Sequence, residues 1–202
     1  MSRIGRILAS GTTLVFALIL STDNATARNF YDDAAIKKDI DALVELLKGD
    51  KVDDAKVKTA VADIKKKYDD LNDLMKIYKP TAKKGLGWNP AKKGKGDGIE
   101  QRINDLGTKK ALTKPQMAKE KELILRATYY NLALYEITKG FAPDKIKGGK
   151  GPKDWNKHND EIMEGSKEVF AAVKANDPAA LKKAMGRIGG GCTECHADFR
   201  DR

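Results

Sequence analysis

Apolar residues recur along the chain with the three- and four-residue spacing of amphipathic helices, and no stretch alternates in the manner of a strand. The pattern predicts five substantial helices and one short one. Their predicted starts are Asp32 or Asp33, Asp53 or Asp54, Ile99, Thr113, Asp154 and Asp177. Short connections favour antiparallel neighbours. The sequence therefore predicts an all-α fold with an antiparallel four-helix-bundle core, an additional N-terminal helix and a long basic loop.

Boundary signals support several of these helices. Thr113 and Gln116 have the spacing of a capping box, and Asp177 is a capping residue followed by Pro178 at the first helical position. The second predicted helix is expected to continue from Asp53 or Asp54 to a stop before Pro80. Its predicted inner face carries Val57, Val61, Ile64, Tyr68, Leu71 and Met75.

Residues 1–27 have the composition of a secretory signal peptide. Arg3 and Arg6 precede a short apolar run, and Ala25-Thr26-Ala27 follows it as an A-x-A cleavage site. The apolar run is short for a retained membrane anchor. We therefore expect a cleaved signal peptide, a single helical domain over residues 28–202, export to the periplasm and no stable membrane span after cleavage.

The chain is basic, with 39 Lys and Arg residues against 29 Asp and Glu residues. Expected export, and the alternation of lysines with acids on helix faces, argue against nucleic-acid binding. A positive field would instead favour an acidic redox partner. The loop 79–98 concentrates lysines around Trp88, which needs a buried site, and a cofactor edge is one candidate.

The strongest chemical signal is Cys192-Thr193-Glu194-Cys195-His196, a C-x-x-C-H sequence typical of covalent haem attachment. Two thiols three residues apart on a helix lie on one face, where both can add to the vinyl groups of one porphyrin edge. His196 can then bind the iron as an axial ligand. These are the two cysteines of the chain. The sequence predicts one covalent haem c with its iron.

Other uses of the motif are less favoured. A structural zinc site needs four ligands, and only His158 could supply another Cys or His. A thioredoxin-type pair is expected near a strand-helix-strand pattern, which is absent. A haem-free bundle with a Cys192–Cys195 disulfide stays open. Gly186 and the glycines at 189–191 precede the motif, and they indicate either close approach of the backbone to the porphyrin or a frayed or kinked helix.

The run from Cys192 to Arg200 (CTECHADFR), together with Ala179–Met185, resembles the last helix of the class II c-type cytochromes, the cytochrome c′ group. The resemblance extends over about residues 116–202. It implies a four-helix bundle in which His196 ligates iron and Arg200 lies near that ligand at the haem. In this family the sixth ligand, when present, is a methionine near the start of the first bundle helix. Gas-binding members have an apolar residue there.

Three possibilities remain open for the sixth iron position. It could have no ligand and an apolar surrounding from residues such as Val57, Val61 or Ile36. It could be filled by His158, which shares a predicted helix face with Trp155 and Ile162. It could also be filled by a methionine, which would raise the potential. The candidate methionines are Met75, Met117 and Met163.

The expected function is that of an exported monohaem electron carrier without enzymatic activity. The alternative is a five-coordinate haem protein that binds NO or CO. The haem is expected at one end of the bundle, near the start of the helix carrying Trp155 and His158 and the end of the helix carrying Ile137 and Phe141. A homodimer is compatible with the sequence.

Overall fold

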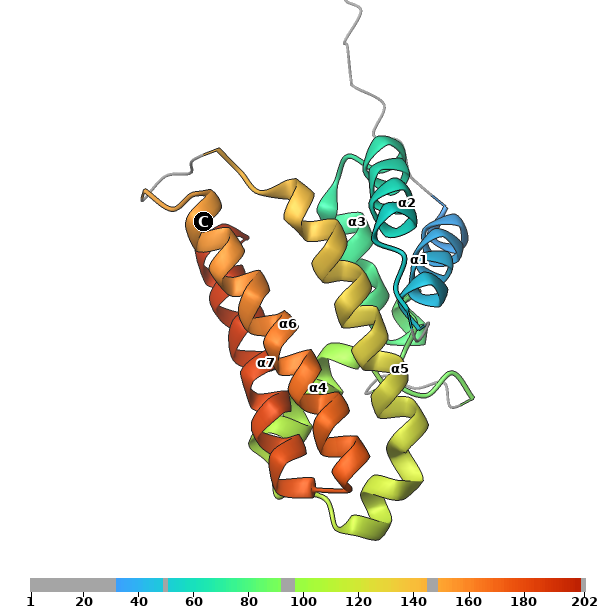
Figure 1. Ribbon diagram of the computed structural model, residues 1–202, viewed down its shortest axis with the longest axis vertical. Coiled ribbons are helices and arrows are strands. Elements are labelled where there is room, and N and C mark those ends of the chain that lie inside the picture. Colours follow the sequence, from blue (N-terminus) through green and yellow to red (C-terminus); the bar gives the residue numbers. More distant parts are fainter. Residues whose placement is uncertain (1–31, 49–50, 92–96, 145–148, 201–202) are drawn as a thin grey trace, which may run out of the picture. The chain divides into compact units, whose positions relative to one another are not determined.

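The computed structural model describes residues 32–48, 51–91, 97–144 and 149–200, and all regular elements in these ranges are helical (Figure 1). The all-α prediction is confirmed. The predicted signal peptide at 1–27 lies outside the described residues and stays a prediction. Among the described helices, none has the length and apolar character needed to cross a membrane.

The described part of the chain forms seven α-helices and three 3₁₀ turns. Their bounds are α1 Asp33–Leu47, α2 Asp54–Lys67, α3 Leu71–Met75, η1 Lys76–Tyr78, η2 Thr81–Lys83, α4 Ile99–Thr108, α5 Lys114–Thr138, η3 Lys139–Phe141, α6 Pro152–Ala175 and α7 Pro178–Phe199. The elements η1, η2 and η3 are single 3₁₀ turns.

The predicted helix starts are confirmed by capping contacts. The Asp32 side chain accepts a hydrogen bond from the Ala34 amide, and Asp53 accepts one from the Lys56 amide. Thr113 and Gln116 form the reciprocal capping box at the start of α5. Asp177 accepts hydrogen bonds from the Ala179 and Ala180 amides at the start of α7. Because α6 ends at Ala175, only two residues separate the two helices, and they form a hairpin.

The prediction of one continuous helix from Asp53 or Asp54 to Met75 is wrong, because the chain leaves the helical conformation at Tyr68. The Tyr68 backbone is extended, and its hydroxyl donates to Asp39 of α1 at 2.6 Å. Asp70 then caps a new short helix by accepting from the Asn72 amide at 2.8 Å. The segment from Leu71 to Tyr78, which contains α3 and η1, is therefore separate from α2.

The bundle is built around the three long C-terminal helices. In Figure 1, α5, α6 and α7 run in alternating directions, as predicted for antiparallel neighbours. The α4 helix packs on α7, while α1 and α2 pack on α5. One continuous apolar core joins them, with Ile124, Leu134, Ile137, Val169 and Ile188 among its buried members.

Glycines allow α7 to approach its neighbours closely, and α7 is a continuous helix through all of them. A β-carbon on Gly107 of α4 would lie 2.7 Å from the backbone of Gly186. A β-carbon on Gly165 of α6 would lie 2.7 Å from the Ile188 side chain. The alternative of a frayed helix at these glycines is therefore wrong. Gly107, Gly165 and Gly186 serve close helix packing.

Candidate functional site

The motif at the end of α7 borders a cavity of about 460 Å³. This volume lies within the usual range of small-molecule and cofactor sites. Cys192, Cys195 and His196 line it from α7, and Trp155 and Ile162 line it from α6. The remaining wall comes from α3, η1, α4 and the C-terminal half of α5. The predicted location, at the start of α6 and the end of α5, agrees with this cavity.

Both cysteines are free thiols that line the cavity one helical turn apart. Burial raises the pKa of Cys192 to about 12, with smaller contributions from the charges of Cys195 and Glu100. Burial likewise raises the pKa of Cys195 to about 11, with a smaller contribution from Asp198. In the haem-free protein both groups are therefore neutral thiols at physiological pH.

His196 lies one residue after Cys195 and also lines the cavity. Arg200, one turn later on α7, places Nη1 2.9 Å from Nδ1 of the imidazole. A guanidinium group can only donate hydrogen bonds, so the imidazole nitrogen accepts. Arg200 also lines the cavity, which agrees with its predicted place beside the histidine. In the haem-free protein this bond fixes the orientation of the His196 ring relative to α7.

The wall contributed by α6 is rigid because its polar groups bond to one another. The Trp155 indole donates from Nε1 to the carbonyl of Thr138 at 2.8 Å, and its ring meets Phe199 edge-on with centroids 5.0 Å apart. Asn159 donates to the Trp155 carbonyl and accepts from the Thr138 hydroxyl. The polar side-chain atoms of this part of the wall are thus hydrogen-bonded to one another or to the backbone.

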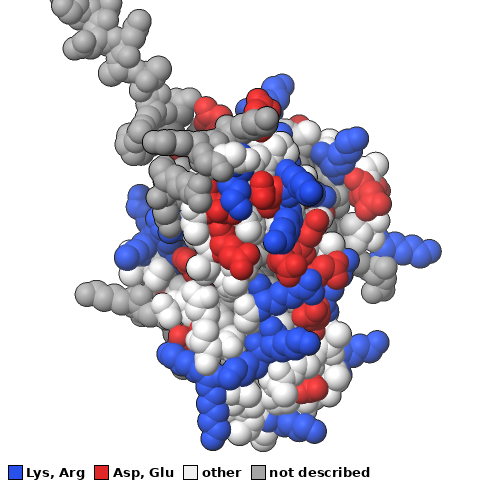
Figure 2. All heavy atoms as spheres, turned by 90° about the vertical axis from the view of Figure 1, so that its left-hand side faces the viewer, with Lys and Arg blue, Asp and Glu red and all other residues white. Residues whose placement is uncertain are grey.

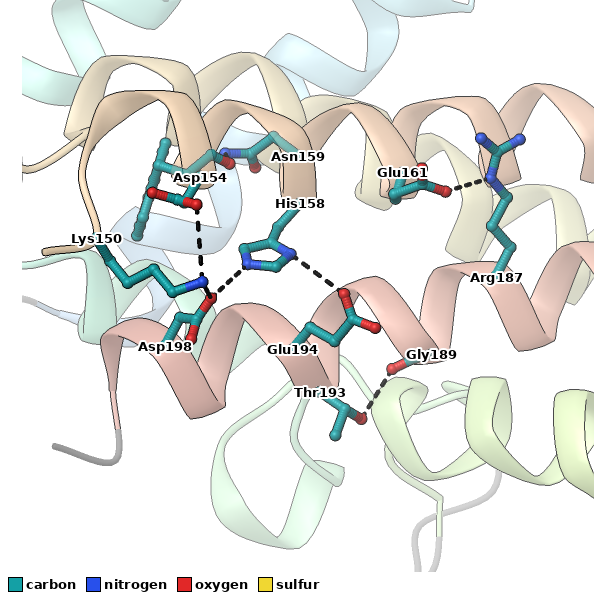
Figure 3. Close-up of polar contacts among 11 residues, drawn as sticks. Lys150, Asp154, His158, Asn159, Glu161, Arg187, Gly189, Thr193, Glu194 and Asp198 are labelled. Carbon is teal, nitrogen blue, oxygen red and sulfur yellow. Dashed lines mark hydrogen bonds and ion pairs between the residues drawn. The ribbon is translucent and has the colours of Figure 1, made fainter. Parts of the chain in front are cut away.

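His158 is not among the residues that line the cavity. Figure 3 shows its ring between α6 and α7, pointing at acidic residues of α7. Its Nε2 lies 2.9 Å from Asp198, and its Nδ1 lies 3.6 Å from Glu194. Lys150 also pairs with Asp198 at 3.1 Å. His158 therefore links the two helices, and this arrangement argues against His158 as an iron ligand.

The wall opposite α7 contains one methionine predicted as a candidate ligand and two residues that sequence reasoning did not assign to the site. Met75 of α3, Tyr78 of η1 and Asn131 of α5 all line the cavity. Val57, Val61 and Ile36, which were considered for an apolar sixth side, do not line it. Met117 and Met163 do not line it either. The three-residue spacing of Met75 and Tyr78 is the one sequence signal that could have placed both on a common face.

Trp88 is buried, as predicted, but it does not line this cavity. The guanidinium of Arg102 lies over its ring at 5.8 Å from the centroid. Arg126 donates to the backbone carbonyls of Gly87 and Trp88 at 3.0 and 3.2 Å. The expectation that Trp88 meets the cofactor edge is therefore wrong. Trp88 anchors the basic loop to α4 and α5.

The chemistry of the cavity fits a covalently bound haem c. Free thiols one helical turn apart, an imidazole beside the second thiol and a mostly apolar lining occur together at one site. Cys192 and Cys195 would hold the porphyrin, and His196 would hold the iron. No cluster of three or more His, Cys, Asp or Glu side chains suited to a metal ion occurs in the described part of the chain. This argues against the alternative of a structural zinc site.

Comparison with known proteins gives the same result for the C-terminal helices. The family model for cytochrome c′ matches residues 150–200. Cytochrome c-556 of Rhodopseudomonas palustris is 38% identical over 71 residues, which cover 33% of this chain and 48% of that protein. The chain thus spans about half the length of this relative. No solved structure matches the chain. In its last two helices the chain is therefore similar to the class II c-type cytochromes, the cytochrome c′ family, whose cofactor is covalently bound haem c with its iron.

Proposed function

We propose that this protein is an exported monohaem cytochrome that transfers electrons. The observation that carries the proposal is that Cys192, Cys195 and His196 line one cavity from the same helix end. The bound haem supplies one-electron redox chemistry. The protein would contribute two thioether positions, an axial imidazole beside Arg200 and a cavity for the porphyrin.

Met75 is the side chain best located to act as the sixth ligand. It is the methionine among the three predicted candidates that lines the cavity, and it comes from an element across the cavity from α7. Met75 belongs to α3, which the break at Tyr68 separates from α2. A thioether opposite His196 would give a His/Met site, which raises the reduction potential and suits an electron carrier.

We further propose that the protein has no enzymatic activity and exchanges electrons with an acidic partner in the periplasm. Figure 2 shows acidic and basic side chains intermixed over much of one face, with mainly Lys and Arg towards its lower end. Exposed lysines near the α6–α7 turn include Lys174 and Lys183. A basic surface of this kind steers negatively charged proteins, and electron transfer should slow as ionic strength rises.

The alternative is a five-coordinate haem protein that binds NO or CO. It would hold if Met75 lined the cavity without reaching the iron. The deciding experiment is an absorption spectrum of the haem-loaded protein in its oxidised and reduced forms, with and without CO. A low-spin ferrous spectrum that CO does not change supports electron transfer. A high-spin ferrous spectrum that shifts with CO supports gas binding.

The haem attachment itself is tested by mass and by substitution. The mature chain, produced in cells that assemble c-type cytochromes, should carry the mass of one haem. His196→Ala should remove the axial imidazole and change the spin state while both thioether bonds still form. A colourless protein at its peptide mass would refute both the electron-transfer and the gas-binding proposals.

A further inference from the structure

A hydrogen-bonded pair of side chains lies in the part of the cavity wall that η1 and α5 form. The Tyr78 hydroxyl donates to Oδ1 of Asn131 at 2.8 Å, and both residues line the cavity. Asn131 is 1% exposed. Its Nδ2 is buried and has no hydrogen-bond partner within the described ranges. Buried donors are rarely left unpaired in native proteins, so this amide calls for an acceptor.

In this pair the Tyr78 hydroxyl is the donor and Asn131 Oδ1 is the acceptor. Burial raises the pKa of Tyr78 well above its ordinary value, and the nearby Cys192 and Glu100 contribute in the same direction. The hydroxyl therefore remains protonated and donates to Asn131 Oδ1. This bond orients the amide so that its two N–H groups, rather than its oxygen, are left to meet an acceptor.

A bound haem offers two kinds of acceptor, its propionate carboxylates and a ligand on its iron. The cavity near Tyr78 is unfavourable for a carboxylate. Asp69 and Glu100 line the same cavity, and the charge of Glu100 acts on Tyr78; Arg200, the cation among the described lining residues, belongs to α7. Burying a carboxylate beside acids with only a neutral amide for a partner is costly. The acceptor is then a ligand on the iron.

We propose that Asn131, held by Tyr78, donates a hydrogen bond to a diatomic ligand such as NO, CO or O₂ bound on the side of the iron that faces away from His196. The inference rests on the proposed haem attachment. It does not depend on whether Met75 binds the resting iron, because Met75 and Asn131 line the same wall. A diatomic ligand that takes the place of Met75 meets the amide.

The test uses the haem-loaded protein with Met75→Ala, in the ferrous state, with CO and then NO as the probes. A donor to the ligand oxygen lowers the C–O stretching frequency, so adding Asn131→Leu should raise that frequency in the infrared spectrum. Loss of one hydrogen bond should also make NO dissociate about fivefold faster, which corresponds to about 1 kcal/mol.

Two further variants control the experiment. His158→Ala removes a buried polar side chain that lies outside the cavity, so the C–O stretch should stay unchanged. The pair Tyr78→Phe with Asn131→Leu removes both polar partners together, which avoids leaving the Tyr78 hydroxyl unpaired. It should reproduce the shift of Asn131→Leu while preserving the fold, as judged by circular dichroism.

An unchanged C–O stretch and NO dissociation rate in both Asn131 variants would overturn the inference. Failure of the Met75→Ala protein to bind CO at all would overturn it as well. Failure of the proposed function is distinguished from these results, because the purified protein would then lack covalently attached haem.

Discussion

His158 of α6 and Asp198 of α7 form a contact of 2.9 Å between Nε2 and the carboxylate, beside the haem-attachment motif but outside the cavity. Asp198 also forms an ion pair with Lys150, whose Nζ lies 3.1 Å from the carboxylate. The hydrogen bond from His158, and then that from Lys150, hold the pKa of Asp198 below its ordinary value. The contact joins the first turns of α6 to the last turns of α7, where the thiols are located.

The structure predicts that His158→Ala leaves the haem spectrum unchanged in both oxidation states, because the ring points away from the cavity. The same variant should lower the thermal unfolding midpoint by a few degrees, since a buried interhelical contact is lost. Absorption spectroscopy and thermal circular dichroism measure the two effects. A change of spin state in His158→Ala would contradict this assignment and restore His158 as a ligand.

Replacing Met75 tests the sixth iron position directly. Met75→Ala should convert a low-spin ferrous spectrum into one that shifts on adding CO, and it should lower the reduction potential. Met163→Ala is the matched control, because Met163 lies outside the cavity and should change neither property. Equal CO binding by the wild-type protein and Met75→Ala would show that Met75 does not bind iron.

The crossing of α4 and α7 predicts opposite effects for two glycine substitutions. Gly107→Ala should destabilise the protein by about 1–3 kcal/mol, because the new β-carbon meets the Gly186 backbone and the helices must separate. Gly190→Ala should stabilise it by about 0.5–1 kcal/mol, because no atom lies within 4 Å of the added carbon and alanine favours the helix. Urea unfolding of both variants measures the difference.

The raised thiol pKa values predict slow alkylation of the folded, haem-free protein. With the pKa of Cys195 at about 11 instead of 9.0, its thiolate fraction at neutral pH is about 100-fold lower than that of an exposed cysteine. Alkylation by iodoacetamide should accelerate as pH rises towards 11. It should also accelerate in denaturant at neutral pH, where the burial that raises the pKa is lost. Equal rates in folded and unfolded protein would contradict the proposed burial.

Much of the fold follows from local sequence signals. The caps at Asp32, Asp53, Thr113 and Asp177 are short-range features, and each begins a helix where the sequence predicts it. The break at Tyr68 could not be read in this way. It depends on a contact with Asp39, 29 residues earlier, which competes with the helical periodicity that continues to Met75.

The site also has a part that local sequence signals predict and a part that depends on long-range packing. The cysteines, His196 and Arg200 are adjacent in sequence, so a motif predicts their common location. Met75, Tyr78 and Asn131 reach the cavity only through the packing of α3, η1 and α5, and no short motif relates them. The sequence left His158 open as a ligand, because helical periodicity defines a face only approximately and the pairing with Asp198, which turns the ring towards α7, has no local signal.

Because of the break between α2 and α3, the residues for haem attachment and the residues on the opposite side of the cavity belong to separate segments. The thiols and the axial histidine belong to the α6–α7 hairpin, whereas the group opposite them comes from the eight residues between Leu71 and Tyr78. Substitutions in that short segment would change which molecules can bind at the sixth iron position, while the residues of covalent attachment stay the same. Ligand preference can therefore diverge between such proteins through substitutions in this one segment, while the hairpin that carries the attachment residues is conserved in structure.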